Sequence, residues 1–133
     1  MKKTAKQLVD EATALITTYS VAQAKAMLGD PHVQFVDVRD VRELERDGVI
    51  PGAIHAPRGM LEFWFDPESP YHRKEFARDQ EYVLFCAAGW RSALATRTLL
   101  EMGFERVAHI GGGFQAWKEA GGPVVPKPSK KQF

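Results

Sequence analysis

"EYVLFCAAGWRSALATRTLLEMG", residues 81–103, is the stretch that decides the fold, and it contains the only cysteine of the chain. Its opening, "EYVLFC", is an apolar run of the kind found in the central strands of parallel sheets. Its second half, "RSALATRTLLEMG", has apolar residues at helical spacing and ends in glycine, which predicts a helix. The stretch therefore predicts a strand, a short loop of small residues and a helix, with Cys86 at the end of the strand.

Outside this stretch, strands and helices continue to alternate. Runs rich in β-branched and aromatic residues predict further strands near residues 34–38 and 106–110. The alternation predicts an α/β domain in three layers, with a central, mostly parallel sheet and helices on both faces. In such sheets ligands bind beyond the carboxyl ends of the strands, which is where Cys86 lies.

Helix signals occupy much of the remaining chain. Residues 4–18 have apolar side chains at helical spacing and suit an amphipathic helix. Ser20 and Asp40 are typical N-caps of two further helices, and Gly48 is a typical end for the second of these. We also expect short helices over 60–65, 72–77 and 114–122.

Length and composition bound the function. A chain of 133 residues with 44% hydrophobic and 26% charged residues is typical of one soluble globular domain. We divide it into an N-terminal helical extension (1–19), the main domain (20–125) and a flexible Pro- and Lys-rich tail (126–133). The net charge of +1 gives no electrostatic reason to expect nucleic acid or an acidic membrane as a partner.

The compartment expected from these features is the cytoplasm. A single cysteine cannot form an internal disulfide, so a reducing environment is the simpler expectation. No apolar run approaches the ~20 residues of a membrane span. The opening "MKK" is not followed by the apolar segment of a signal peptide.

The loop after Cys86 has the composition of an anion site. Its small residues allow the backbone to curl around one atom, so that N–H groups converge there. The positive end of the following helix points to the same place, and Arg91 adds a permanent charge. These effects stabilise a thiolate over a thiol and make a cysteine reactive. We expect the loop to comprise Ala87, Ala88, Gly89, Trp90 and Arg91.

Other interpretations of these residues are weaker. A free cysteine is often simply a small buried hydrophobe, but the strand, the small loop and the arginine favour a site. The loop lacks the GxxxxGK[ST] pattern of a phosphate cradle, and no histidine forms a local motif with Cys86, although His55 or His109 could approach it in space. The scattered histidines show no metal-ligand spacing, and the glycines at 111–113 lack a GxGxxG context, so we expect neither a metal nor a cofactor.

The sequence resembles the single-domain rhodaneses, or thiosulfate sulfurtransferase-like domains, from about residue 20 to about residue 122. The resemblance implies the rhodanese-like α/β fold. Four segments carry it in order: "FVDVRDVRE" (35–43), "GVIPGAIHAP" (48–57), "VLFCAAGWRS" (83–92) and "GFERVAHIGGGFQAWKEAGGPV" (103–124).

The resemblance also implies a mechanism. Cys86 matches the nucleophile, which would take the outer sulfur of a donor such as thiosulfate and hold it as a persulfide until an acceptor thiolate or cyanide removes it. The partners expected are thus a small-molecule or protein sulfur donor and a thiol acceptor, for a monomer or homodimer. Asp37 and Arg39 match a signature expected to be structural. Arg58 and Glu62 would form part of the pocket wall, or a surface ion pair and a solvated carboxylate.

Loop length separates the family from its relatives. Four residues lie between Cys86 and Arg91, whereas similar phosphatases and arsenate reductases have five, a wider cradle that suits a tetrahedral anion. Ala87 and Ala88 stand where thiosulfate enzymes of the family tend to carry charges, so the physiological donor could be a persulfide. A non-catalytic binding or regulatory module on the same fold, and less so a phosphatase or arsenate reductase, remain the alternatives.

Overall fold

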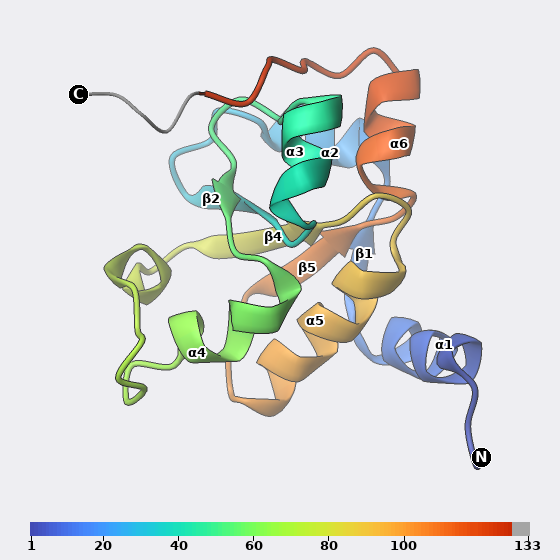
Figure 1. Ribbon diagram of the computed structural model, residues 1–133, viewed down its shortest axis with the longest axis vertical. Coiled ribbons are helices and arrows are strands. Elements are labelled where there is room, and N and C mark those ends of the chain that lie inside the picture. Colours follow the sequence, from blue (N-terminus) through green and yellow to red (C-terminus); the bar gives the residue numbers. More distant parts are fainter. Residues whose placement is uncertain (129–133) are drawn as a thin grey trace.

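The computed structural model describes residues 1–128 and contains a five-stranded parallel sheet (Figure 1). The strand order is β1-β5-β4-β2-β3, and every neighbouring pair is parallel. This confirms the predicted α/β class and the mostly parallel sheet. The strands are β1 (Thr17–Tyr19), β2 (Val33–Asp37), β3 (Ile54–His55), β4 (Glu81–Phe85) and β5 (Val107–Ile110).

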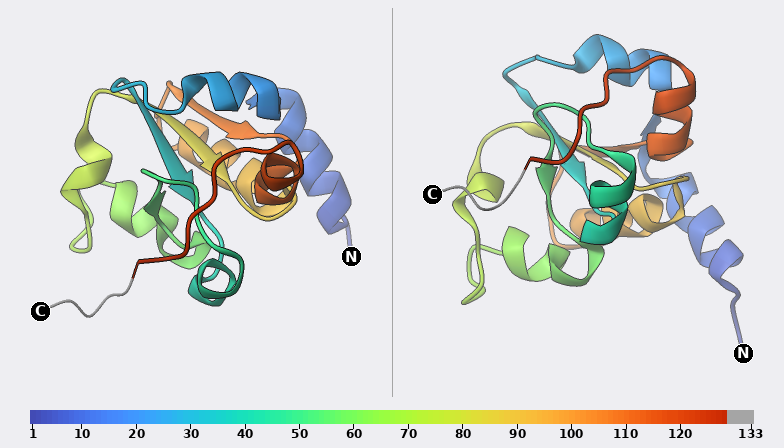
Figure 2. Two further views of the ribbon diagram at one scale, coloured as in Figure 1. Left: turned by 90° about the horizontal axis from the view of Figure 1, so that it is seen from above. Right: turned by 45° about the horizontal axis from the view of Figure 1, so that its top comes forward.

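Helices cover both faces of the sheet, as the two views of Figure 2 show. Helices α2 (Val21–Met27) and α6 (Gly113–Glu119) pack on one face, whereas α4 (Leu61–Phe65) and α5 (Trp90–Glu101) pack on the other. Helix α1 (Ala5–Leu15) lies against the outer side of α5. The remaining elements are α3 (Val41–Asp47) and two 3-10 turns, Arg58–Met60 and Lys74–Ala77.

Strand β4 lies between two hydrophobic cores, which explains why its sequence does not alternate between apolar and polar residues. Val83 and Phe85 face the core shared with α2 and α6, while Leu84 and Cys86 face the core shared with α5. Because both faces are covered, the buried positions from Tyr82 to Phe85 all carry apolar or aromatic side chains. Cys86 ends this run and is 1% exposed.

Two predicted helix starts are confirmed. Ser20 caps α2 in a reciprocal box with Gln23, and Asp40 caps α3 by accepting a hydrogen bond from the Arg42 amide at 2.8 Å. Helix α3 ends at Asp47 with Gly48 as its C-cap, as predicted. The expected helix over 72–77 is instead a short 3-10 turn at Lys74–Ala77.

The prediction of a helix over residues 4–18 was wrong at the C-terminal end of the helix. It ends at Leu15, and Thr17–Tyr19 form β1, which pairs with the open edge of β5. Two β-branched residues and a tyrosine suit a strand once that edge is available. Of the flexible tail expected over 126–133, residues 129–133 lie outside the described residues. None of the helices in residues 1–128 has both the length and the apolarity needed to cross a membrane.

Candidate active site

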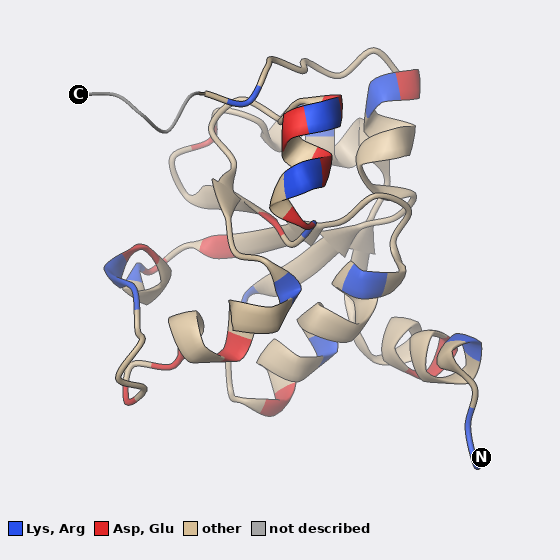
Figure 3. Ribbon diagram, in the orientation of Figure 1, with Lys and Arg blue, Asp and Glu red and all other residues tan. Residues whose placement is uncertain are grey.

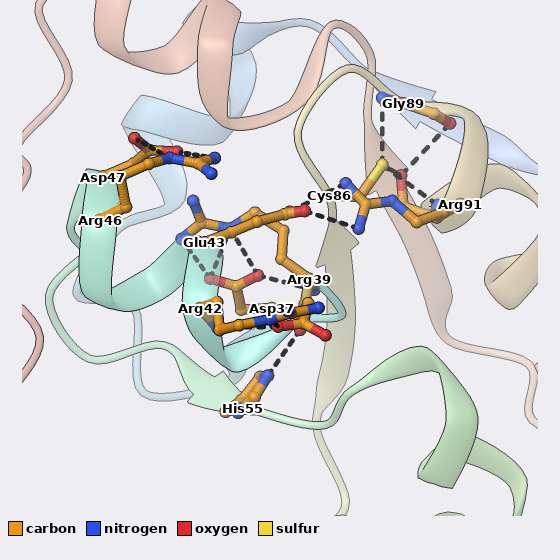
Figure 4. Close-up of polar contacts among 12 residues, drawn as sticks. Asp37, Arg39, Arg42, Glu43, Arg46, Asp47, His55, Cys86, Gly89 and Arg91 are labelled. Carbon is orange, nitrogen blue, oxygen red and sulfur yellow. Dashed lines mark hydrogen bonds and ion pairs between the residues drawn. The ribbon is translucent and has the colours of Figure 1, made fainter.

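The loop after β4 folds around the sulfur of Cys86. Helix α5 begins at Trp90, one residue earlier than predicted, and Gly89 precedes it with φ of 112°. This left-handed backbone favours glycine, which has no Cβ to clash. The turn brings the amides of Gly89 and Ser92 to 3.1 and 3.4 Å from Cys86 Sγ, and Figure 4 shows the contact with Gly89. The loop therefore presents two N–H donors to the sulfur.

The start of α6 holds the carbonyl side of the same loop. The amides of Phe114 and Gln115 donate to the carbonyls of Cys86 and Ala87 at 2.8 and 3.0 Å. This approach requires glycine at position 113, where a Cβ would lie 2.5 Å from the Cys86 carbonyl oxygen. Because α6 engages these carbonyls, the loop can turn its amides toward the sulfur.

A polar chain lies behind the sulfur. Ser92 Oγ is 3.5 Å from Cys86 Sγ, 3.4 Å from the Gly89 carbonyl oxygen and 2.9 Å from Nδ1 of His109 on β5. Nε2 of His109 lies 3.1 Å from the hydroxyl of Thr18 on β1. Burial lowers the pKa of His109 to about 4, so its imidazole is neutral at neutral pH.

Arg91 is held by a carboxylate. Its two terminal nitrogens donate to both oxygens of Glu43 on α3, at 2.9 and 3.0 Å (Figure 4). The bonds to Glu43, and to a lesser degree the nearby Cys86 sulfur, raise the pKa of Arg91 above its ordinary value. Helix α3 carries both acidic and basic residues (Figure 3), and its Glu43 is the residue that binds Arg91. Much of the positive charge expected beside the sulfur is thus neutralised.

Asp37 and Arg39 form a buried pair next to the loop. They are 2% and 1% exposed, and Arg39 binds both carboxylate oxygens of Asp37, with the closest contact at 2.7 Å. Arg39 also donates to the Gly48 carbonyl at 2.9 Å, and its guanidinium lies 4.0 Å from the centre of the Phe114 ring. The pair links the end of β2 to the end of α3 and the start of α6.

Arg58 and Glu62 contact each other. Their ion pair measures 2.9 Å, and Arg58 also lies 3.4 Å from the Thr98 hydroxyl of α5. Both side chains are about one third exposed. Their expected place in a pocket wall stays a prediction. Trp90, the first residue of α5, has 53% of its surface exposed.

Sequence reasoning missed three polar residues of this site, Glu43, Ser92 and Thr18. Glu43 and Ser92 end two of the segments that carried the family resemblance, so their places in those motifs were the available signal. Thr18 had no such signal, because it was assigned to a helix. Among residues 1–128, no three His, Cys, Asp or Glu side chains gather as metal ligands would.

A parallel sheet with a cysteine loop between its central strand and the next helix is the arrangement expected of a rhodanese-like fold. The chain belongs to the rhodanese family: the model of the rhodanese-like domain matches residues 20–120. This confirms the resemblance found in the sequence.

Known proteins resemble the chain over most of its length. A sulfurtransferase from Allochromatium vinosum is 32% identical over 110 residues, which are 83% of this chain and 92% of that protein. The structure of a rhodanese-related protein from Thermoplasma volcanium is 30% identical with a TM-score of 0.70, covering 84% of this chain and 99% of the other. A protein of unknown function from Rhodopseudomonas palustris, described as a possible tyrosine phosphatase, is 50% identical with a TM-score of 0.91, covering 94% of this chain and 96% of that one.

Proposed function

We propose that the protein is a sulfurtransferase that carries a sulfane sulfur as a persulfide on Cys86. The observation that carries the proposal is the convergence of the Gly89 and Ser92 amides on Cys86 Sγ, at 3.1 and 3.4 Å, at the start of α5. Backbone donors fixed in this way stabilise negative charge on sulfur, both in the thiolate and in the persulfide. The similarity of the chain to the sulfurtransferase from Allochromatium vinosum supports the same proposal.

The reaction has two steps, and Cys86 is regenerated in the second. The Cys86 thiolate attacks the outer sulfur of the donor, a new S–S bond forms, and the old bond breaks with its electron pair on the leaving group (sulfite from thiosulfate, a thiolate from a persulfide). An acceptor thiolate then attacks the outer sulfur of the enzyme persulfide. The S–S bond breaks and its electron pair returns to Cys86.

The charge around the loop favours a persulfide donor over thiosulfate. Two alanines follow Cys86, and the cationic side chain of Arg91 is engaged by Glu43. A dianion such as thiosulfate needs a cation for its sulfonate oxygens. The other cations beside the loop, Arg46 and Lys118, line a cavity with Ala87 rather than with Cys86. A persulfide donor presents its charge at the sulfur itself, where the loop amides lie.

The phosphatase alternative is suggested by the description of the Rhodopseudomonas palustris relative. The loop contains four residues between Cys86 and Arg91, and Arg91 is bound at both terminal nitrogens by Glu43. Two of the five N–H donors of Arg91 are thus engaged, and the Glu43 carboxylate offsets the charge that would attract a phosphate dianion. The paired arginine therefore favours sulfur transfer.

The test is to incubate the protein with glutathione persulfide or thiosulfate and to measure its intact mass. We expect an adduct of about 32 Da on the wild-type chain, its loss on adding cyanide with release of thiocyanate, and no adduct on the Cys86→Ser variant. An aryl phosphate and arsenate are assayed in parallel. Absence of the adduct with every sulfane donor would overturn the proposal, and turnover of the aryl phosphate or of arsenate would replace it with the alternative.

A further inference from the structure

The polar chain behind Cys86 connects a buried sulfur with the protein surface. Cys86 is 1% exposed and His109 is 4% exposed, whereas Thr18 at the other end of the chain is exposed. Three hydrogen-bonding steps, of 3.5, 2.9 and 3.1 Å, join Cys86 Sγ to Ser92, Ser92 to His109 and His109 to Thr18. Each side chain between the two ends can donate one proton while accepting another.

The direction of these hydrogen bonds depends on the protonation of the sulfur. When Cys86 is a thiol, its S–H donates to Ser92, Ser92 donates to Nδ1 of His109, and Nε2–H donates to Thr18. When Cys86 is a thiolate, the chain reverses: Thr18 donates to Nε2, Nδ1–H donates to Ser92, and the Ser92 hydroxyl donates to sulfur. The two states differ in the tautomer of a neutral imidazole.

We propose that Ser92, His109 and Thr18 form a proton relay that carries the Cys86 proton to solvent and then donates a hydrogen bond to the thiolate or persulfide. The proton leaves sulfur for Ser92 Oγ, the Ser92 proton moves to His109 Nδ1, the Nε2 proton moves to Thr18, and the Thr18 proton moves to water. One proton enters the chain and one leaves it, so every side chain of the relay ends neutral. His109 and Thr18 are positioning residues, because they act on the sulfur through Ser92.

The surroundings of His109 suit this role. Burial alone lowers its pKa, so the ring stays neutral and exchanges tautomers without storing charge. The charged side chain nearest the sulfur in the hydrogen-bond network is Arg91 from α5, itself paired with Glu43 from α3. Arg46 from α3, which pairs with Asp47, and Lys118 from α6 line a cavity with the loop residue Ala87. Arg91 thus contributes a charge that Glu43 largely offsets, whereas the relay supplies a path and a donor.

The relay also gives the N-terminal segment a part in the site. The match to the family model begins at residue 20, and Thr18 precedes it. Strand β1 brings Thr18 directly opposite His109 in the parallel register. Only the hydrogen bond to a persulfide rests on the proposed function. Removal of the Cys86 proton through the relay would serve any reaction that uses the Cys86 thiolate.

The first test measures alkylation of Cys86 by iodoacetamide between about pH 6 and pH 9 in the full chain. Loss of one hydrogen bond to the thiolate should slow the reaction about tenfold at the acid end of this range in Ser92→Ala, and several-fold in Thr18→Val. Thr18→Ser should restore the wild-type profile, since it keeps the hydroxyl. The matched control is Thr17→Val, an exposed threonine on the same strand.

The second test follows the tautomer of His109 by nitrogen NMR of a labelled protein. We expect Nε2–H in the thiol state and Nδ1–H in the thiolate state, both at pH values above the pKa of His109 of about 4. A wild-type alkylation profile in Thr18→Val, or a tautomer that does not change with the state of Cys86, would overturn the relay. Neither readout requires sulfur transfer, so failure of the persulfide assay leaves this test intact.

Discussion

At the scale of single residues, Glu43 decides how much of the Arg91 charge is left to act on Cys86 Sγ. Its carboxylate is half-buried on α3 and binds Arg91 through two hydrogen bonds of 2.9 and 3.0 Å. Such a bidentate pair orients the guanidinium as well as neutralising it. Substitution of this one carboxylate separates the two effects of Arg91, its charge and its bracing of the loop.

We predict that Glu43→Gln increases sulfur transfer from thiosulfate. The glutamine keeps the shape of the side chain but leaves the charge of Arg91 free to attract the dianion, so kcat/KM for thiosulfate should rise about fivefold. The rate with a persulfide donor should change less, and Glu45→Gln, an exposed carboxylate on the same helix, should leave both unchanged. A fall in kcat/KM with both donors would mean that Glu43 chiefly braces the loop.

A second residue, Gly113, sets how closely α6 approaches the loop. An alanine Cβ there would lie 2.5 Å from the Cys86 carbonyl oxygen, at a φ of 62°. We predict that Gly113→Ala lowers the unfolding free energy and slows alkylation of Cys86, because the loop must move away from α6. The control is Gly121→Ala, which has a φ of 77° but no heavy atom within 4 Å of its added Cβ. Equal losses in both variants would point to backbone strain alone.

At the scale of elements, the buried pair of Asp37 and Arg39 joins β2, α3 and α6. Removing one partner leaves a charge buried without compensation, which typically costs about 3–5 kcal/mol. We predict this loss for Arg39→Met in urea unfolding followed by circular dichroism. The double variant Asp37→Asn, Arg39→Met should recover part of the loss, since no lone carboxylate is then buried. No recovery would indicate that the contacts of Arg39 with Gly48 and Phe114 dominate.

The elements that the sequence predicted well are those with local signals. Ser20 and Asp40 cap their helices through side-chain chemistry that lies within a few residues, and β4 shows its double-sided burial in the unbroken run from Tyr82 to Phe85. Strand β1 could not be found in this way. Its three residues continue a helical pattern, and only the edge of β5, some ninety residues later, makes them a strand.

The residues of the candidate site also fall into those with a local sequence signal and those without one. Cys86 and its loop were predicted because they are contiguous in the sequence and match a family motif. The polar residues hydrogen-bonded to them, directly or through Ser92, come from distant segments: Glu43 from α3, His109 from β5 and Thr18 from β1. Their contacts depend on strand order and helix packing, which no local pattern encodes.

At the scale of the whole molecule, His109 links stability to pH. Its pKa falls from an ordinary value of 6.5 to about 4 on folding, because the folded chain buries the imidazole. The unfolded chain therefore binds the extra proton first as pH decreases. The contribution of His109 is fully present above pH 6.5 and is lost between pH 6.5 and about pH 4, amounting to about 3 kcal/mol.

We predict that this part of the acid destabilisation disappears in His109→Phe. The measurement is the urea midpoint at several pH values from neutral to about pH 4 for the wild type and the variant. The variant should be less stable at neutral pH, but its midpoint should fall less steeply with decreasing pH. If the urea midpoints of the two proteins fell in parallel with decreasing pH, carboxylates rather than His109 would account for the loss of stability in acid.

The pairing of β1 with β5 also has a consequence for biosynthesis. Strand β1 is synthesised first but can pair only with β5, which is the last strand of the sheet to be made. Helix α6, whose amides bind the carbonyls of the Cys86 loop, is made later still. A ribosome-bound chain that has just exposed residues 81–103 holds the cysteine before β5 and α6, which contact its loop and Ser92, have been synthesised. The arrangement of donors around Cys86 Sγ can therefore form only after residues 107–119 have left the ribosome.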